Sequence, residues 1–284
     1  MSHTRVSFVL GQLQETTCVR LCQPMAGQTL LVTDLSPCHP QSHLWPDQPG
    51  DIGIARWEGG EAHIAPCQMG AISPQGELFV DSAIPVKRGA EGWDFVVVHP
   101  LGGEHALPHG MSITLIADKE RRHLFSLGHS GCHLAALALN RVLQPYWKKE
   151  VDERDALGQP DFDRLAITQS RVEPRGSKEQ YRIGKSLRKK GVMGPELLAA
   201  LPEIEGAINQ QLALWVAQGS AITRSRSGEA IIDSRWWHCT LDDKPVTIPC
   251  GGTHVESVQH LGAVSVSLAP SDEGFTLHTR VSGI

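Results

Sequence analysis

Residues 118–145, DKERRHLFSLGHSGCHLAALALNRVLQP, decide the fold of this 284-residue chain. The stretch begins with charged side chains and then becomes apolar, rich in alanine and leucine. The spacing of its apolar residues predicts a helix over Ser126 to Leu143, which ends before Pro145 because proline cannot continue a helix. Since the character of the chain changes near Asp118, we predict two domains, residues 1–117 and residues 118–284.

The residues before this helix have the pattern of a β domain. Short apolar runs are separated by clusters of glycine, proline and aspartate; the runs are Thr29 to Val32, Leu78 to Val80, Phe95 to Val98 and Ser112 to Ile116. The 28 glycines and 18 prolines of the chain indicate many turns. This pattern predicts a small barrel or sandwich at the N-terminus, and we take a β-barrel-like domain as the expectation.

The residues after the helix mix helices and strands. Residues 151–163 are acidic and loop-like, and residues 195–218 predict an amphipathic helix interrupted near Pro202. Its apolar positions are Leu197, Leu198, Leu201, Ile204, Ile208, Leu212 and Trp215. From Ile231 the pattern returns to strands, ending in GAVSVSLAP and GFTLHTRV. The fold class that follows is α+β, with an antiparallel sheet in the second domain.

Composition narrows the class of protein. Hydrophobic residues make up 40% and charged residues 20% of the chain, which is typical of a folded globular protein and excludes a disordered one. The net charge of −5 excludes a general attraction to nucleic acid, so any RNA contact requires a local basic patch. Seven scattered cysteines indicate thiols, metal ligands or core residues rather than a disulfide framework.

The sequence contains no pattern of a membrane protein or a secreted protein. No run approaches the roughly 18 apolar residues of a membrane span. The N-terminal MSHTRVSFVLGQLQE lacks the basic leader, long apolar region and cleavage site of a signal peptide. We therefore expect a cytoplasmic location and no membrane partner. The sequence does not determine the oligomeric state.

Two pairs of residues have the spacing of metal ligands. His129 and His133 are four residues apart in the predicted helix, and so lie on one helical face. Cys250 and His254 are four apart in PCGGTH, where two glycines let the backbone bend. Three imidazoles and one thiolate are a ligand set that suits zinc. We predict one Zn²⁺ per chain, bound by these four residues.

Each pair alone has a simpler interpretation. An isolated HxxxH pair is more often a surface or core pair, and an isolated cysteine in a turn is usually a small buried hydrophobe. Cys132 lies beside His133 in sequence but points elsewhere on a helix, so we interpret it as a core thiol. His99, His105 and His109 are alternative ligands for a second metal. Their loop-like spacing and the absence of a nearby cysteine favour solvent-exposed histidines instead.

The predicted zinc indicates hydrolytic chemistry. Zinc with an open position lowers the pKa of a bound water molecule and polarises an ester carbonyl. An aminoacyl-tRNA bond is an activated ester. Four protein ligands ordinarily fill a tetrahedral shell, so catalysis requires the coordination to expand or one ligand to be loose. We expect the metal-bound water to be catalytic; the sequence does not identify a general base.

The same residues resemble a known family. HSGCHLAALALN (129–140), CGGTHV (250–255) and YRIGKSLRKKG (181–191) look like the editing domain of alanyl-tRNA synthetase and its free-standing AlaX-type trans-editing relatives. This domain is the second additional domain shared by threonyl- and alanyl-tRNA synthetases. The resemblance covers about residues 110–280. It implies an α+β editing-type domain and a metal on His129, His133, Cys250 and His254.

The resemblance is weaker in the first half of the chain. Longer family members have a threonine-aromatic segment, a glycine triplet, Gln-Pro and Asp-x-Gly, and this chain has SPCHPQSHLWPDQPGDIG (36–53). Ser36 replaces the threonine, and SHLWPD replaces the glycine triplet. This loop borders the amino-acid pocket in the family, so the departure bears on substrate choice and on activity. The substrate pocket that the resemblance implies contains Ser36, Gln48, Gly251, Gly252 and Thr253; His39 and His43 are further candidates.

The resemblance also implies the substrate, tRNA(Ala) mischarged with serine or glycine. A pocket sized for alanine discriminates poorly against similar small side chains, so accuracy needs a second, hydrolytic site. We find no ATP-binding signature before the editing-like half, and therefore expect deacylation in trans. The expected partner is the acceptor end of tRNA(Ala).

One segment is strongly basic, and it contains Arg171, Arg175, Lys178, Arg182, Lys185, Arg188, Lys189 and Lys190. Contact with RNA phosphates is the functional interpretation of this segment, with Arg224 and Arg226 as additions. A solvated surface is the alternative. Tyr181 is a candidate for stacking on the terminal adenine, although a core or surface tyrosine is the simpler interpretation. Trp236 and Trp237 alternate across a strand, so at least one of them packs in the core.

Two other functions fit the same residues. The metal centre would serve a different small ester or amide if the loop at 36–53 builds a different pocket. Alternatively, the chain is a non-catalytic RNA-binding module stabilised by a structural, four-coordinate zinc. Deacylation of Ser-tRNA(Ala) and Gly-tRNA(Ala), and the effect of His254→Ala on it, distinguish these functions.

Overall fold

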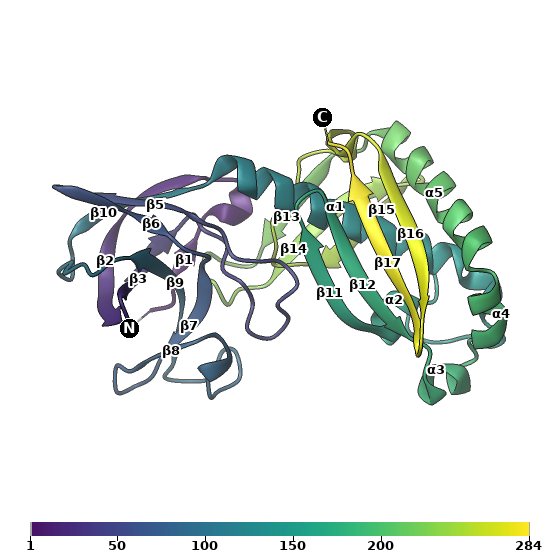
Figure 1. Cartoon of the computed structure of the whole chain (residues 1–284), viewed down its shortest axis with the longest axis horizontal. Helices are drawn as coiled ribbons and strands as arrows, with labels where there is room; N and C mark the ends of the chain where they lie inside the picture. Colours follow the sequence, from purple (N-terminus) through teal and green to yellow (C-terminus); the bar gives the residue numbers. More distant parts are fainter. Residues whose placement is uncertain (1, 284) are drawn as a thin grey trace. The chain divides into compact units, whose positions relative to one another are not determined.

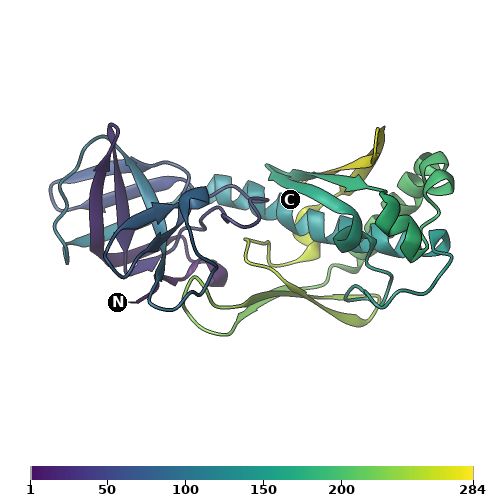
Figure 2. The same ribbon diagram turned by 90° about the horizontal axis from the view of Figure 1, so that it is seen from below.

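The computed structural model describes residues 2–283, and its contacts divide the chain into two compact units. Of the described residues, the first unit contains 2–122, 224–236 and 249–253, and the second contains 123–223, 237–248 and 254–283. Figures 1 and 2 show a β-rich unit in purple and blue and a unit in teal to yellow that mixes helices with sheets. The predicted α+β class is confirmed. The predicted domain boundaries, 117 and 118, stay a prediction.

The first unit is built around a closed antiparallel barrel. Within the described residues six strands form the ring in the order β3-β2-β10-β5-β6-β9, and pairing of β3 with β9 closes it. These strands are β2 (Gln14–Met25), β3 (Gln28–Thr33), β5 (Gly53–Trp57), β6 (Gly60–Ile64), β9 (Asp94–Gly102) and β10 (Ser112–Ala117). β7 (Gln68–Ile72) and β8 (Leu78–Val80) extend from β9, and β1 (Arg5–Val6) pairs in parallel with β4 (Leu35–Ser36).

The sequence explains this barrel locally. All four predicted apolar runs lie in strands, and residues such as Leu31, Phe95 and Leu115 are fully buried in it. The turn between β2 and β3 is Ala26–Gly27, and both residues have positive φ angles of 49° and 81°. Such mirror-image turns match the twist of a hairpin. Short helical turns lie at η1 (Phe8–Leu10) and η2 (Asp81–Ala83).

Two further antiparallel sheets are formed by the strands that follow α1 in the chain. Within the described residues the larger sheet has the order β11-β12-β17-β16, from β11 (Ile167–Glu173), β12 (Gly176–Arg182), β16 (Val264–Ser271) and β17 (Gly274–Val281). The smaller sheet has the order β13-β14-β15, from β13 (Ile222–Arg226), β14 (Arg235–Leu241) and β15 (Lys244–Pro249). The basic stretch after residue 170, for which the sequence predicted no strand, forms the β11–β12 hairpin.

The predicted helices are present with two corrections. α1 spans Lys119–Val142, seven residues earlier than predicted, because the Asp118 carboxylate accepts the Arg121 N–H at 2.8 Å and so caps the charged first turn. The helical region near Pro202 divides into α4 (Gly194–Ala199) and α5 (Leu201–Gln218), with proline in the first turn of α5. The shorter helices are α2 (Phe162–Ala166), α3 (Lys185–Lys190), η3 (Gln144–Tyr146) and η4 (Val258–Leu261). None of the described helices combines the length and apolarity needed to cross a membrane.

α5 protects the free edge of the larger sheet. The Asn209 side chain bonds both the N–H and the C=O of Val266 in β16, at 2.7 and 3.0 Å, and Glu205 accepts the Leu268 N–H at 2.7 Å. These bonds satisfy an edge strand that would otherwise offer its backbone to other chains.

Candidate metal centre

α1 places His129 and His133 on the same side of the helix. Their ring centroids are 4.9 Å apart. Two glycines let this helix approach the larger sheet closely: a Cβ atom at Gly128 would lie 2.3 Å from the Glu173 carbonyl oxygen, and one at Gly131 would lie 2.6 Å from Val281 Cγ2. The glycines of LGHSGCH therefore fix the position of the helix, and with it the two imidazoles.

His254 joins this pair from the chain that follows β15. Its ring centroid is 4.6 Å from that of His129 and 5.0 Å from that of His133. The Ser130 hydroxyl accepts the N–H of Val255 at 3.2 Å and lies 3.2 Å from His254 Nδ1. One serine of α1 thus fixes both the backbone and the imidazole of the second dyad.

The fourth predicted ligand lies with the three imidazoles. The ligand atoms of His129, His133, Cys250 and His254 all lie within 4.8 Å of one another. The Trp237 ring packs against His133 and His254, with centroid distances of 5.4 and 6.3 Å. Sequence reasoning predicted a buried tryptophan here, and Trp237 is fully buried, but the reasoning missed its contact with the imidazoles.

Burial controls the charge state of these groups. Burial first, and the neighbouring His129 second, lower the pKa of His133 well below the usual range, so this imidazole is neutral at neutral pH. Burial raises the pKa of the Cys250 thiol to about 12, although the Gly252 N–H bonds its sulfur at 3.5 Å. A neutral imidazole is the form that binds a metal, and a thiol that binds zinc gives up its proton to the metal's charge.

The four residues fit a zinc ion. His133 Nε2 is buried and has no hydrogen-bond partner, a costly state for a polar atom unless a ligand satisfies it. Three imidazole nitrogens and one sulfur are the donor set that zinc prefers.

The predicted pocket residues fall into two groups. Gln48 and Thr253 bond each other twice: the Gln48 amide donates to Thr253 Oγ1 at 2.8 Å, and the Thr253 N–H donates to Gln48 Oε1 at 3.0 Å. The loop at 36–53 is therefore fixed to CGGTHV, next to Gly252. Ser36 is instead buried in the barrel, with its hydroxyl 2.8 Å from His99 Nε2. His39 is also buried, and burial lowers its pKa to about 3.

A hollow of about 650 Å³ adjoins Cys250 and Gly251. Arg88 and Arg235 line it, and both guanidinium groups donate to the Ile231 carbonyl, at 2.7 and 3.1 Å. Burial, with Arg88 as a further cause, lowers the pKa of Arg235 to about 10, so both groups keep their positive charge at neutral pH. Asp233 also lines the hollow, so its two cations exceed this one anion, and the net positive charge favours an anionic ligand. Sequence reasoning missed both arginines, because neither lies in a motif.

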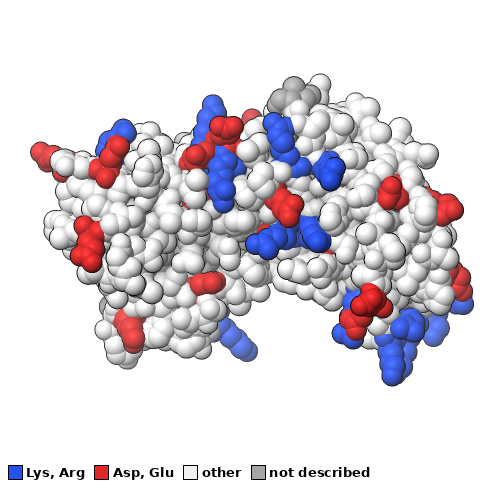
Figure 3. Space-filling view, in the orientation of Figure 1, with Lys and Arg blue, Asp and Glu red and all other residues white. Residues whose placement is uncertain are grey.

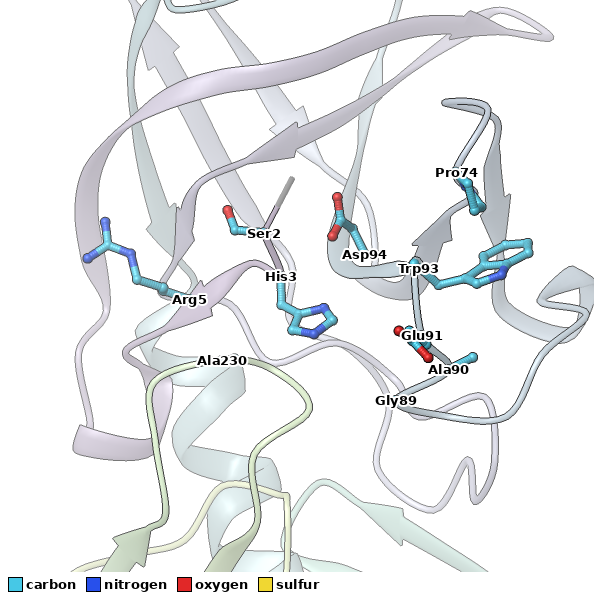
Figure 4. A pocket seen from close by; sticks show the side chains of 11 residues that line it. Ser2, His3, Arg5, Pro74, Gly89, Ala90, Glu91, Trp93, Asp94 and Ala230 are labelled. Atoms are coloured by element: carbon cyan, nitrogen blue, oxygen red, sulfur yellow. The ribbon is translucent and has the colours of Figure 1, made fainter.

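A second hollow, of about 750 Å³, lies in the first unit and is shown in Figure 4. Its lining includes His3, Arg5, Trp93 and Asp94. Asp94 is paired with Arg20, and His3 accepts the Phe95 N–H at 2.9 Å. None of the predicted site residues lines it.

The basic segment lies on β11, β12 and α3. Arg171 pairs across the hairpin with Lys178, so the two side chains share a face. Figure 3 shows lysines and arginines gathered over α3, with acidic side chains beside them. Several members have internal partners: Arg175 bonds the Ser282 carbonyl, Arg182 pairs with Glu273 and Lys190 with Glu153. Four members lie at exposed positions: Arg171, Lys185, Arg188 and Lys189.

Two residues that the sequence offered as functional candidates have structural roles. Tyr181 is buried and donates to Asp163 at 2.6 Å, which makes it a core tyrosine. Cys132 is half-buried on α1 and donates to Glu179 at 3.3 Å. His99 was expected in an exposed loop and is instead fully buried on β9, because this strand continues through Pro100 to Gly102.

No family model matches the chain. Two curated proteins are similar to it. One is the alanine–tRNA ligase of Pyrobaculum arsenaticum, 23% identical over 221 residues, which are 77% of this chain and 20% of that protein. The other is the alanine–tRNA ligase of Pyrobaculum neutrophilum, 23% identical over 232 residues, which are 80% of this chain and 22% of that protein. The chain spans about a fifth of the length of these relatives, and is distantly similar to that part of them.

Proposed function

We propose that this chain is a zinc-dependent aminoacyl-tRNA deacylase that acts in trans on Ser-tRNA(Ala) or Gly-tRNA(Ala). The observation that carries the proposal is the convergence of His129, His133, Cys250 and His254 within 4.8 Å. The similarity to part of alanine–tRNA ligase supports an alanine-tRNA substrate. The resemblance of HSGCH and CGGTHV to the editing domain supports hydrolysis rather than aminoacylation.

The four residues would hold the zinc, which when bound supplies a Lewis acid able to polarise an ester carbonyl and to acidify water. The protein's own part is to position the metal-binding imidazoles and to keep water away from them. Ser130 holds His254: for Nε2 to bind a metal, Nδ1 must carry the proton and donate to the Ser130 hydroxyl. Trp237 covers two imidazoles and limits their contact with water.

The rest of the substrate site follows from the contacts of CGGTHV. Thr253 is fixed by Gln48, so the loop at 36–53 contributes to the pocket for the amino acid through Gln48. Arg88 and Arg235, at the hollow beside Cys250, bind the phosphates near the acceptor end. The accessible arginines and lysines of β11 and α3 bind the tRNA backbone farther from the ester.

The test is deacylation by the purified chain. We expect turnover of Ser-tRNA(Ala) or Gly-tRNA(Ala), slow turnover of correctly charged Ala-tRNA(Ala), and loss of activity in His133→Ala. The matched control is His260→Ala, because His260 is an exposed histidine of the same unit. Hydrolysis of small free esters without turnover of either mischarged tRNA would reject the proposal in favour of a different small substrate.

A structural zinc is distinguished by His254→Ala. If the metal is catalytic, this variant binds tRNA with unchanged affinity and loses deacylation. A variant that binds tRNA and deacylates at the wild-type rate would assign the metal, if present, a purely structural role.

A further inference from the structure

A second set of metal-ligating side chains lies in the first unit and shares no residue with the four ligands described above. The sulfur atoms of Cys38 and Cys67 and a ring nitrogen of His99 lie within 4.8 Å of one another. All three residues are fully buried. They come from distant parts of the chain, since Cys38 follows β4, Cys67 precedes β7 and His99 belongs to β9. We propose that Cys38, Cys67 and His99 bind a second, structural zinc ion.

The imidazole is already oriented for a metal. His99 Nδ1 lies 3.2 Å from the Leu31 carbonyl, which only accepts, so Nδ1 carries the proton and donates. The other nitrogen, Nε2, then accepts a hydrogen bond from the Ser36 hydroxyl at 2.8 Å, and a bound metal would take over this lone pair. A backbone carbonyl that fixes the tautomer of a metal-binding histidine is a recurring arrangement in zinc sites. The Ser36 hydroxyl is the nearby oxygen donor for a fourth position.

Electroneutrality selects a divalent cation. Two thiolates and a neutral imidazole carry two negative charges, which Zn²⁺ cancels, so the filled site adds no net charge to the barrel interior. Asp51, a buried carboxylate of the loop at 36–53, is already neutralised by Arg122, whose Nε bonds both of its oxygens at 2.9 Å. A monovalent soft cation would leave an uncompensated negative charge in the interior.

The backbone around Cys67 explains what such an ion would stabilise. The backbone N–H of Cys67 donates to the Asp51 carbonyl at 2.9 Å, and the backbone carbonyl of Cys67 accepts from the Gln41 N–H at 2.9 Å. A Cβ atom at Gly50 would lie 1.9 Å from the Cys67 carbonyl oxygen, so this glycine allows the two segments to touch. The ion would therefore join both ends of the loop at 36–53 to β9, with no part in the chemistry at His129.

The test is metal stoichiometry of the full-length chain by elemental analysis. We expect two zinc ions in the wild type and one in Cys67→Ala. Cys239→Ala, which removes a buried thiol of β14, is the matched control and should keep two. The double variant His133→Ala/Cys250→Ala should keep one. A wild-type content of one ion that falls to zero in this double variant would overturn the proposal.

A second measurement leaves the barrel unaltered, in case Cys67→Ala does not fold. The double variant His133→Ala/Cys250→Ala is loaded with Co²⁺ as a probe. We expect the absorption of tetrahedral cobalt with thiolate charge-transfer bands in the near ultraviolet, because only Cys38 and Cys67 remain as proposed sulfur ligands. A spectrum without these bands would contradict the site. An intact mass lower by two hydrogens, with the disulfide assigned to Cys38 and Cys67 by peptide mapping, would also contradict it, because these sulfurs would then be bonded to each other in place of a metal.

Discussion

Glu179→Gln should change how the stability of this protein depends on pH. Glu179 is buried in β12, and its carboxylate accepts hydrogen bonds from Ser177, Cys132 and Ser170 at 3.1, 3.3 and 3.3 Å. Burial is the largest influence and raises the pKa of Glu179 from its ordinary value of 4.5 to about 7, against the lowering effect of these hydrogen bonds. The folded protein therefore holds a proton that the unfolded chain releases.

The sign and the size follow from linkage. Because the pKa is higher in the folded state, the stabilising contribution is complete below pH 4.5 and is lost as the pH rises through 7. For each pH unit between the pKa values of 4.5 and about 7, the unfolding free energy of the wild type falls by about 1.4 kcal/mol, so the total fall is about 3 kcal/mol. The glutamine side chain of the variant stays neutral at every pH. Between pH 4.5 and pH 8 the unfolding free energy of the variant should therefore rise by about 3 kcal/mol relative to that of the wild type.

The assay is urea unfolding of both proteins at a series of pH values, with a chelator present so that metal uptake contributes nothing. The difference in unfolding free energy between variant and wild type should rise across this range. Glu203→Gln, at an exposed position of α5, is the control and should give a constant difference. Parallel profiles for Glu179→Gln and wild type would refute the assignment of a buried, protonated carboxyl.

Three further predictions concern the site. Ser130→Ala should weaken zinc binding by about 10–100-fold, measured by competition with a chelator, because His254 loses the partner of its Nδ1; unchanged affinity would show that Ser130 does not orient this imidazole. Gly128→Ala should lower the unfolding free energy by about 1–3 kcal/mol, because its Cβ meets backbone oxygens. The control Gly206→Ala, with open space around it in α5, should raise the unfolding free energy by about 0.5–1 kcal/mol. Equal effects of the two variants in chemical denaturation would contradict the close packing of α1. Arg88→Ala should raise the KM for aminoacyl-tRNA and reduce the slope of log affinity against log salt by about 1, while the exposed Arg56→Ala should not; an unchanged slope would remove Arg88 from phosphate binding.

Local patterns predicted the parts of the fold that are stabilised locally. The runs of β3, β8, β9 and β10 are visible because they are short apolar stretches bounded by turn residues. The amphipathic face of α5 is visible because its apolar residues recur with the helical period. The two ligand dyads are visible from their spacing in the sequence, and on α1 a spacing of four places both imidazoles on one helical face. The start of α1 was missed because a capping aspartate, Asp118, outweighs the charge of the first turn.

Other features depend on residues far apart in the sequence. The β11–β12 hairpin was missed because its buried face contains polar residues, Ser177, Glu179 and Tyr181, so the apolar alternation is weak. His99 appeared exposed because its partners, Ser36 and the two thiols, lie on segments more than 30 residues away. No short-range pattern encodes such a cluster. Only the closed barrel brings its members together.

The most direct test of the central claim combines zinc analysis with deacylation of Ser-tRNA(Ala) and Gly-tRNA(Ala). Activity is measured on the purified chain, after complete chelation, and after zinc is returned. The account predicts that activity disappears with the metal and returns with it in the wild type, but not in His133→Ala. Full activity in a chain shown to be free of metal would contradict it.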